Sequence, residues 1–235
     1  MESSMTTTII DCEVRTTREI NLALREAALE QTPVVLRNPD CRHNLAVGVT
    51  TPLSVQIDGH VGYYCGGLCD GVDIRVTGDA GWGLAENLMG GRIAITGSAG
   101  SAAGATMRGG TVIVGGDAGA RCGIAMKGGA LIIGGSVGVL SAFMMQKGVL
   151  IICGDAGEGL GDSLYEGKIY VRGKIDSLGS DAVIVEQTAE DAAMLESALA
   201  DAGIHAAASE FQKIVSGKKL YNFSTKEKEI WKTAL

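Results

Sequence analysis

Cysteines and histidines are the side chains of this sequence best able to hold a metal or attack a substrate, and they do not gather in one motif. Cys65 and Cys69, in the stretch YYCGGLC, are the only two of the six cysteines that lie close together. An iron–sulfur cluster needs three or four thiolates, and a common type of zinc site needs two CxxC pairs. We therefore expect reduced and mostly buried thiols.

Histidine and glycine motifs give no stronger sign of catalysis. His43, His60 and His205 are far apart and none has HExxH spacing, so we expect surface or capping roles for them. Gly81 and Gly83 have the GxG spacing of a dinucleotide loop, but no strand-loop-helix pattern surrounds them. Nucleophile-elbow and phosphate-loop motifs are missing as well. Without a nucleophile, a base and an orienting group, the sequence predicts no catalytic, cofactor-binding or metal-binding residue in this chain.

The composition points instead to a core of small side chains with many tight turns. The 235 residues suit one large domain with appendages; 46% of them are apolar, only 4% are aromatic, and 35 are glycine. The net charge of −7 includes no long run of either sign, which disfavours a nucleic-acid or membrane partner. No apolar stretch reaches the roughly 20 residues that cross a bilayer, and the polar start lacks the apolar core of a signal peptide, so we expect a cytoplasmic protein.

A nineteen-residue repeat organises residues 51–176. Each unit follows the pattern GxxGxxxG in whole or in part, and a short β-type run of alternating apolar residues precedes it. A unit of this length is too short for two packed helices, so each unit is one coil of strand and turns, and the coils must stack. The sequence predicts an all-β solenoid, a right-handed parallel β-helix of about seven coils. The first glycines of the units are Gly59, Gly78, Gly97, Gly116, Gly135, Gly154 and Gly173.

Positions one repeat apart should form ladders along the rod. One apolar ladder is expected inside the coils and reads Leu88, Met107, Met126, Met145 and Leu164. The residue after each first glycine alternates aspartate with serine, in a line that reads His60, Asp79, Ser98, Asp117, Ser136, Asp155 and Lys174. We expect each aspartate to share a hydrogen bond with the neighbouring serine. The alternation argues against a calcium β-roll, which needs an aspartate in every nine-residue repeat.

The outer side of the strands is apolar in the central coils, where Ile113, Ile132 and Ile151 should point away from the core. An exposed apolar strip of this kind predicts that something covers it. A terminal helix of the same chain and a partner subunit are equally good candidates for the cover.

Segments at both ends are expected to close the solenoid. Residues 1–50 predict a small α/β cap with a helix at 16–31. Residues 177–235 predict a capping helix at 188–202, ended by Gly203 and followed by an arm rich in aromatic and basic residues. We expect this arm to dock on another protein. Its apolar anchors would be Phe211, Ile214, Tyr221, Phe223 and Trp231.

The GxxGxxxG coils of residues 50–176 resemble the GXGXG domain at the C-terminus of the glutamate synthase large subunit, and more distantly one of the subunits of formylmethanofuran dehydrogenase. The resemblance implies a β-helix that braces the glutaminase and FMN synthase domains and supplies no catalytic residue. As a separate chain, it looks like the small subunit of three-chain relatives such as methylamine-glutamate N-methyltransferase, also called N-methylglutamate synthase. Those relatives imply two partners, one similar to a class II glutamine amidotransferase and one that carries FMN and an iron–sulfur cluster.

The sequence departs from a complete enzyme of this type. A class II amidotransferase uses an N-terminal cysteine after loss of the methionine, whereas Glu2 stands at that position here, and no part of the chain resembles the FMN barrel. Glutaminase and redox chemistry would therefore come from other chains. We expect a non-catalytic structural subunit of N-methylglutamate synthase, which makes N-methylglutamate and ammonia from methylamine and glutamate. The same scaffold in a split glutamate synthase, the related subunit of formylmethanofuran dehydrogenase, and an independent binding β-helix stay open as alternatives.

Overall fold

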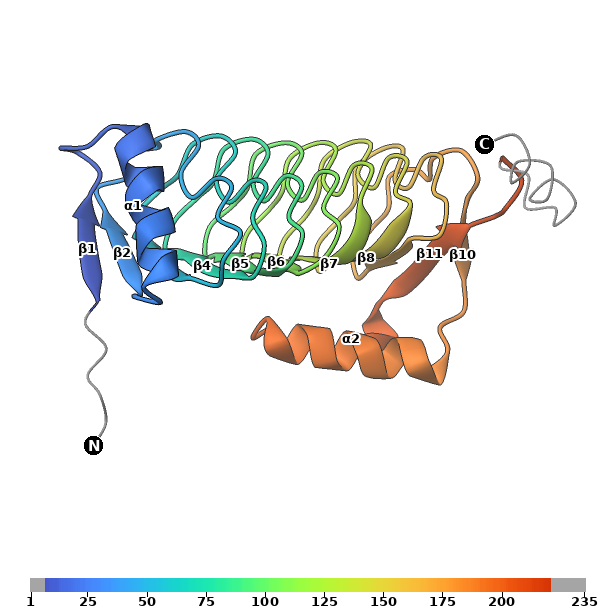
Figure 1. The fold of residues 1–235 in the computed structure, drawn as a ribbon. Helices are drawn as coiled ribbons and strands as arrows, with labels where there is room; N and C mark the ends of the chain where they lie inside the picture. The colour runs from blue at the N-terminus through green and yellow to red at the C-terminus, as the bar shows by residue number, and fades with distance from the viewer. Residues whose placement is uncertain (1–6, 221–235) are drawn as a thin grey trace, which may run out of the picture.

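The computed structural model describes residues 7–220, and its body is a parallel β-solenoid (Figure 1). Each coil contributes one strand, which pairs in parallel with the equivalent strand of the next coil. The predicted solenoid is confirmed, with seven such strands. They are β3 (Ser54–Asp58), β4 (Val72–Val76), β5 (Gly91–Ile95), β6 (Thr111–Val114), β7 (Lys127–Ile133), β8 (Lys147–Ile152) and β9 (Lys168–Val171).

The register of the stack follows the glycine period. Ile74 pairs with Ile93, and Ile93 pairs with Val112, which lies nineteen residues further along the chain. A second line of parallel bridges joins the coils on another side, from Val61 in the first coil to Ile175 in the last. Each coil is therefore hydrogen-bonded to its neighbours along more than one side, as in other solenoids whose repeats contact only the adjacent repeat.

The N-terminal cap has the predicted α/β form. β1 (Thr8–Asp11) pairs in parallel with β2 (Val34–Arg37), which pairs with β3, so the cap extends the sheet of the solenoid. α1 (Thr17–Leu29) begins at a capping box, in which the Thr16 hydroxyl accepts from Glu19 N–H and the Glu19 carboxylate accepts from Thr16 N–H. The apolar face of α1 joins the core of the solenoid at the end of the rod.

The C-terminal segment differs from the expectation. β10 (Ala182–Val185) and α2 (Ala189–Asp201) lie near the expected positions, but a short 3-10 helix η1 (Ala208–Glu210) and strand β11 (Gln212–Ser216) follow them. β11 pairs antiparallel with both β9 and β10. The complete sheet therefore has the order β1-β2-β3-β4-β5-β6-β7-β8-β9-β11-β10.

The prediction of a docking arm is wrong for Phe211 and Ile214. Phe211 is 5% exposed and Ile214 is fully buried, because both belong to the chain's own hydrophobic clusters. Ile214 lies in the sheet between Ile169 of β9 and Ile184 of β10. The other expected anchors lie outside the described residues and are Tyr221, Phe223 and Trp231.

α2 lies against the outer side of the strands (Figure 1) and covers the central isoleucines. Ile113, Ile132 and Ile151 are 6%, 1% and 0% exposed, and they cluster with Leu195 and Leu199 of the helix. Of the two candidate covers, the structure supports the chain's own helix. Neither α2 nor any other helix among residues 7–220 is long and apolar enough to cross a membrane.

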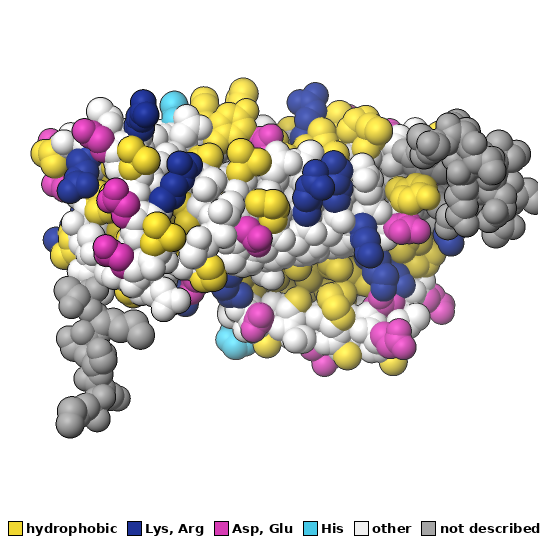
Figure 2. Space-filling model, in the orientation of Figure 1, with side chains coloured by type: hydrophobic (Ala, Val, Ile, Leu, Met, Phe, Trp, Pro, Cys, Tyr) yellow, Lys and Arg dark blue, Asp and Glu magenta, His cyan; other side chains and the backbone are white. Residues whose placement is uncertain are grey.

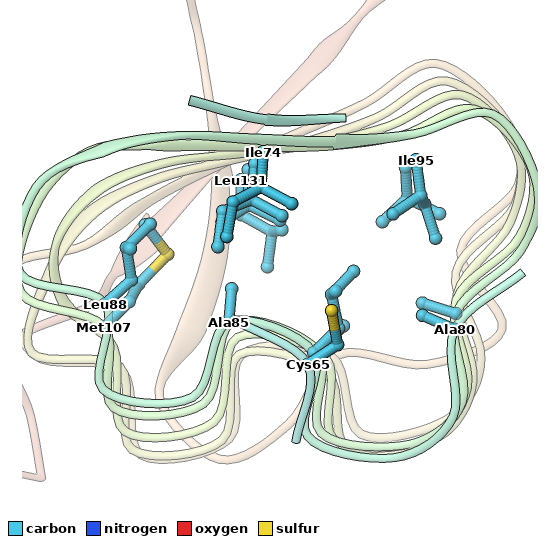
Figure 3. Close-up of a cluster of buried hydrophobic side chains, with 14 of the residues drawn as sticks. Cys65, Ile74, Ala80, Ala85, Leu88, Ile95, Met107 and Leu131 are labelled. Atoms are coloured by element: carbon cyan, nitrogen blue, oxygen red, sulfur yellow. The ribbon is translucent and has the colours of Figure 1, made fainter. Parts of the chain in front are cut away.

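The interior of the coils is filled from two sides. Figure 3 shows Ile74 and Leu131 on the strand side facing Cys65 and Ala85 on the turn side. All five members of the predicted leucine and methionine ladder are fully buried and belong to one core cluster. Methionine suits this interior because its unbranched side chain fills irregular space.

The turns opposite the strands have a backbone that the repeat alone does not predict. In successive coils three residues at alternate positions have a positive φ, for example Tyr64 (60°), Gly66 (69°) and Leu68 (57°). This conformation costs a non-glycine residue about 1 kcal/mol, so neighbouring coils must impose it. Hydrogen bonds between coils do so, as where Tyr64 N–H donates to the Trp82 carbonyl at 2.8 Å.

Candidate assembly surface

The six cysteines are all free and are spread over the described chain without forming a reactive centre. Cys65 and Cys122 are fully buried, and burial raises the pKa of each thiol to about 12. Burial also raises the pKa of Cys69. These thiols stay protonated at neutral pH and act as small core side chains, as expected. Cys41 by contrast is exposed, and Cys153 is partly exposed.

The histidines have structural roles or lie at the surface. His43 Nδ1 accepts a hydrogen bond from Tyr63 N–H at 2.9 Å, and His60 Nδ1 accepts one from Asp79 N–H at 3.0 Å. His205 is exposed. In residues 7–220 no three histidine, cysteine, aspartate or glutamate side chains are grouped so that they could hold a metal ion.

The line of aspartates and serines forms a hydrogen-bond ladder along the solenoid. Ser98 N–H donates to Asp79 Oδ1 at 2.7 Å, and Asp117 N–H donates to Ser98 Oγ at 3.1 Å. The same contact continues coil by coil to Lys174. Each aspartate therefore shares a hydrogen bond with the neighbouring serine, as expected, and each bond joins a side chain to a backbone N–H. Each side chain thereby satisfies a backbone N–H of the next coil, a donor that needs an acceptor when coils stack closely.

This ladder explains the first glycine of five repeats, which are Gly97, Gly116, Gly135, Gly154 and Gly173. A Cβ added to Gly97 would collide with Asp79 Oδ1, and a Cβ added to Gly116 would collide with Ser98 Oγ. Neither glycine has a positive φ, so the close approach of the neighbouring coil, and not turn geometry, excludes a side chain. The polar side chain of one coil occupies the space that a side chain at the next coil's glycine would need.

A buried ion-pair network fixes α2 to the sheet. Asp191 of the helix is 1% exposed and receives hydrogen bonds from Lys213 Nζ at 2.6 Å, Tyr170 OH at 2.6 Å and Lys168 Nζ at 2.9 Å. It also accepts from the N–H and hydroxyl of Thr188, the N-cap of α2. Since Lys213 belongs to β11 and the other two donors to β9, one carboxylate ties the helix to two strands.

The network shifts the ionisation of its members. Burial alone raises the pKa of Asp191, but hydrogen bonds from Lys213 and Tyr170 outweigh burial and hold this pKa well below its usual range. Burial and the hydrogen bond to Asp191 both raise the pKa of the Tyr170 phenol. The carboxylate is therefore charged and the phenol neutral at neutral pH, as their hydrogen bond requires. Because the Asp191 carboxylate at the centre of the network is buried between helix and sheet, we assign the network a structural role.

The turn face lies on the side of the solenoid opposite α2 (Figure 1). It carries exposed apolar side chains. Figure 2 shows hydrophobic side chains protruding along the upper rim of the molecule, where the turns lie. Tyr63, Trp82 and Val139 occupy the same position in three coils and are 42%, 59% and 47% exposed, so no described segment covers them. Uncovered apolar groups that gather on one face are typical of an interaction surface. The turn face comprises residues 59–71, 78–90, 97–109, 116–126 and 135–146.

Aromatic rings stack along the rod at the N-terminal end of the turn face. His43 stacks on Tyr63 with ring centroids 4.3 Å apart, and Tyr63 stacks on Trp82 at 5.6 Å. Glycines make room for these rings, since a Cβ at Gly81 would lie 2.6 Å from Tyr63 Cδ1 and one at Gly100 would lie 2.5 Å from Trp82 Cδ1. The stack was not predicted from the sequence. Its signal is the nineteen-residue separation of Tyr63 and Trp82.

Comparison with known proteins agrees with this architecture. The family described as GXGXG motif matches residues 42–234. "Protein GlxC" of Rhizobium meliloti (strain 1021) is 49% identical over 219 residues, which cover 92% of this chain and 96% of that protein. The similarity to GlxC therefore extends well beyond the nineteen-residue repeats.

Proposed function

Since the chain belongs to the GXGXG motif family, we propose that it is the non-catalytic structural subunit of a heteromeric glutamate synthase-like complex. Within that class we propose N-methylglutamate synthase, which converts methylamine and glutamate to N-methylglutamate and ammonia. The partners would be a class II glutamine amidotransferase-like subunit and an FMN-binding synthase-like subunit, and the second of these would hold FMN and the iron–sulfur cluster. The role of this chain would be to brace the two.

The proposal of a structural role rests on one observation, which is that side chains fill the core of the solenoid. Side chains from both sides occupy the interior, from Leu88 to Leu164 along one ladder, and each of these is fully buried. The thiols inside the coils are held protonated by burial. The interior therefore supports the rod and offers no reactive group to a substrate, which leaves the outer surface for function.

The links between coils suit a brace. Adjacent coils are joined by the strand pairs, by the bridges that start at Val61, and by the aspartate and serine ladder that starts at His60. A rod joined along three lines resists bending, so contacts made at separate coils keep a constant spacing. Such a rod can hold two subunits in one relative orientation, as the transfer of ammonia between their sites would require.

Purification of the complex tests this function. The chain would carry an affinity tag and be co-expressed with the products of the genes that adjoin its own. We expect both partner subunits to co-purify and the complex to form N-methylglutamate from methylamine and glutamate. The isolated chain should retain neither FMN nor iron and should show no glutaminase or synthase activity.

Other outcomes of this purification would change the assignment. Activity with ammonia and 2-oxoglutarate in place of methylamine and glutamate would assign a split glutamate synthase and keep the scaffold role. Stoichiometric flavin or iron on the isolated chain would contradict a scaffold without cofactors. Failure of both partners to co-purify would contradict membership of such a complex.

A further inference from the structure

An aromatic patch lies at the N-terminal end of the turn face. It contains the stacked rings and two side chains of the same turn, Tyr64 and Leu68, which are 47% and 53% exposed. The stack ends at Trp82 because the equivalent residue of the next coil is Ser101, which has no ring. We define the aromatic patch as His43, Tyr63, Tyr64, Leu68 and Trp82.

Charge is distributed unevenly along the turn face. Residues 59–71 and 78–90, which carry most of the patch, contain Asp70, Asp79 and Glu86 and no lysine or arginine. The next three segments of the turn face are mainly cationic, because their charged residues are Arg108, Asp117 and Arg121. Lys127 and Lys147 add positive charge where β7 and β8 begin. The first two segments, which carry Tyr63, Tyr64, Leu68 and Trp82, are therefore the acidic part of the turn face.

Glu86 points to a cationic partner. It is half-buried and lines a small cleft of about 250 Å³ together with Tyr64 and Leu68. Within residues 7–220 its carboxylate makes no hydrogen bond or ion pair. A guanidinium or ammonium group entering the cleft would pair with this carboxylate, and the adjacent Tyr64 ring would attract the same cation.

We propose that the aromatic patch docks a cationic loop of one partner subunit, with an arginine or lysine side chain in the cleft against Glu86 and apolar side chains on Trp82. This inference rests on the proposed function, because it needs partner subunits. Tryptophan and tyrosine often dominate interface energies, and a charge pair beside them sets the orientation of the partner. A second copy of this chain fits less well. A symmetric contact through the patch would bring the carboxylates of Asp70, Asp79 and Glu86 in two copies face to face.

The repeat itself supplies substitutions that the fold tolerates. Ala120 occupies the position of Trp82 two coils further on, and Ala105 occupies the position of Glu86 in the next coil. Trp82→Ala and Glu86→Ala should therefore fold, which thermal unfolding would check. Val139→Ala is the matched control, because Val139 has the same position as Trp82, is 47% exposed and lies three coils away.

Calorimetry of the purified chain with each purified partner subunit would measure the contribution of the patch. We expect Trp82→Ala to weaken binding about 30-fold or more, Glu86→Ala about 10-fold, and Val139→Ala less than about threefold. The effect of Glu86→Ala should shrink at about 0.5 M salt, because salt screens the charge pair.

If Trp82→Ala binds the partner with an affinity within about threefold of the wild type, the proposed docking site is wrong. This conclusion holds whether the aromatic patch stays open or is covered by residues 221–235 or by a second copy of the chain. That result would leave the proposed function intact, since the complex would still form. If the wild-type chain binds neither subunit, the proposed function fails and the docking site fails with it.

Discussion

Replacing Asp191 by asparagine tests how α2 is held on the sheet. The substitution keeps the size of the side chain and one acceptor oxygen, but it removes the charge that faces Lys213 Nζ at 2.6 Å. Only 11% of the Lys213 side chain is exposed, so water can replace little of the interaction that its ammonium group makes with the carboxylate. Asp191→Asn would therefore leave a buried cation without its counter-charge.

The expected loss of unfolding free energy is about 3 to 5 kcal/mol, as found when one partner of a buried ion pair is removed. Lys168 should add little, since 48% of its side chain is exposed and water can replace the carboxylate. The amide oxygen of asparagine can still accept from Tyr170 OH or from Thr188 N–H. The unpaired charge of Lys213 therefore accounts for most of the loss of unfolding free energy.

Chemical denaturation would give the free energy of unfolding, and hydrogen exchange would show whether α2 opens before the solenoid. Asp201→Asn is the matched control on the same helix, because Asp201 pairs with Arg92 at 3.8 Å and 76% of its side chain is exposed. We expect this control to lose less than about 1 kcal/mol. Equal losses for the two variants would refute the reasoning. Asp191→Asn combined with Lys213→Met should recover most of the stability, because the amide still accepts from Tyr170 OH or Thr188 N–H and no unpaired charge is then buried.

Lowering the pH should reproduce, in the wild-type chain, the loss of stability expected for Asp191→Asn. Since the folded chain holds the pKa of Asp191 below its usual value, the stabilising effect is present above the unfolded-state pKa of about 3.9 and is lost as the pH falls towards the folded-state pKa. Unfolding free energies measured from about pH 6 down to about pH 3 should therefore decline more steeply for the wild type than for Asp191→Asn. Parallel curves would contradict the assigned pKa shift.

Three further substitutions test the coil geometry and the cover. Gly116→Ala should lower the free energy of unfolding by about 1 to 3 kcal/mol, because its Cβ collides with Ser98 Oγ. In chemical denaturation, the double variant with Ser98→Ala should lose less stability than the sum of the losses of the two single variants. Arg121→Val should be about 1 to 2 kcal/mol less stable than Arg121→Ala, because a β-branched side chain is strained at the φ of 57° found there; equal stability would contradict this. Ile132→Asp should release α2 or unfold the chain, because Ile132 is 1% exposed beneath the helix, and circular dichroism would detect either result. Ile132→Val should lower the free energy of unfolding by only about 0.5 to 1.5 kcal/mol.

The solenoid could be predicted because its register is visible in the sequence. Glycines nineteen residues apart place Ile74 beside Ile93, and the structure pairs these residues. The methionine ladder follows from the same period. Local rules also predicted the start of α1, where Thr16 and Glu19 form the capping box. In each case the sequence signal lies within one repeat or one helical turn of the contact that it predicts.

Features that depend on distant partners could not be predicted in this way. β11 is a short strand whose neighbours β9 and β10 are separate in the sequence, so no repeat in the sequence predicts that β11 pairs with them. Lysine at position 213 made the segment look solvent-exposed, whereas the carboxylate of Asp191 allows Lys213 to be buried. The positive φ of Tyr64 has the same kind of cause, since it depends on a hydrogen bond to the next coil and not on the residue type.

The repeat separates what the fold needs from what a partner could recognise. Along the axis, the first glycine of each coil from Gly97 onward must accommodate the aspartate or serine of the preceding coil, so Gly97 and Asp79 constrain one another. At the outward position on the turn face a glycine of the next coil leaves room, as Gly81 does for Tyr63, and the residue varies from coil to coil through Tyr63, Trp82, Ser101, Ala120 and Val139. A side chain can therefore change there without disturbing the stacking of the coils, whereas a change at the first glycine alters the contact between two coils. This division explains how a rod of nearly uniform geometry can present an acidic aromatic surface at one end and a cationic one further along.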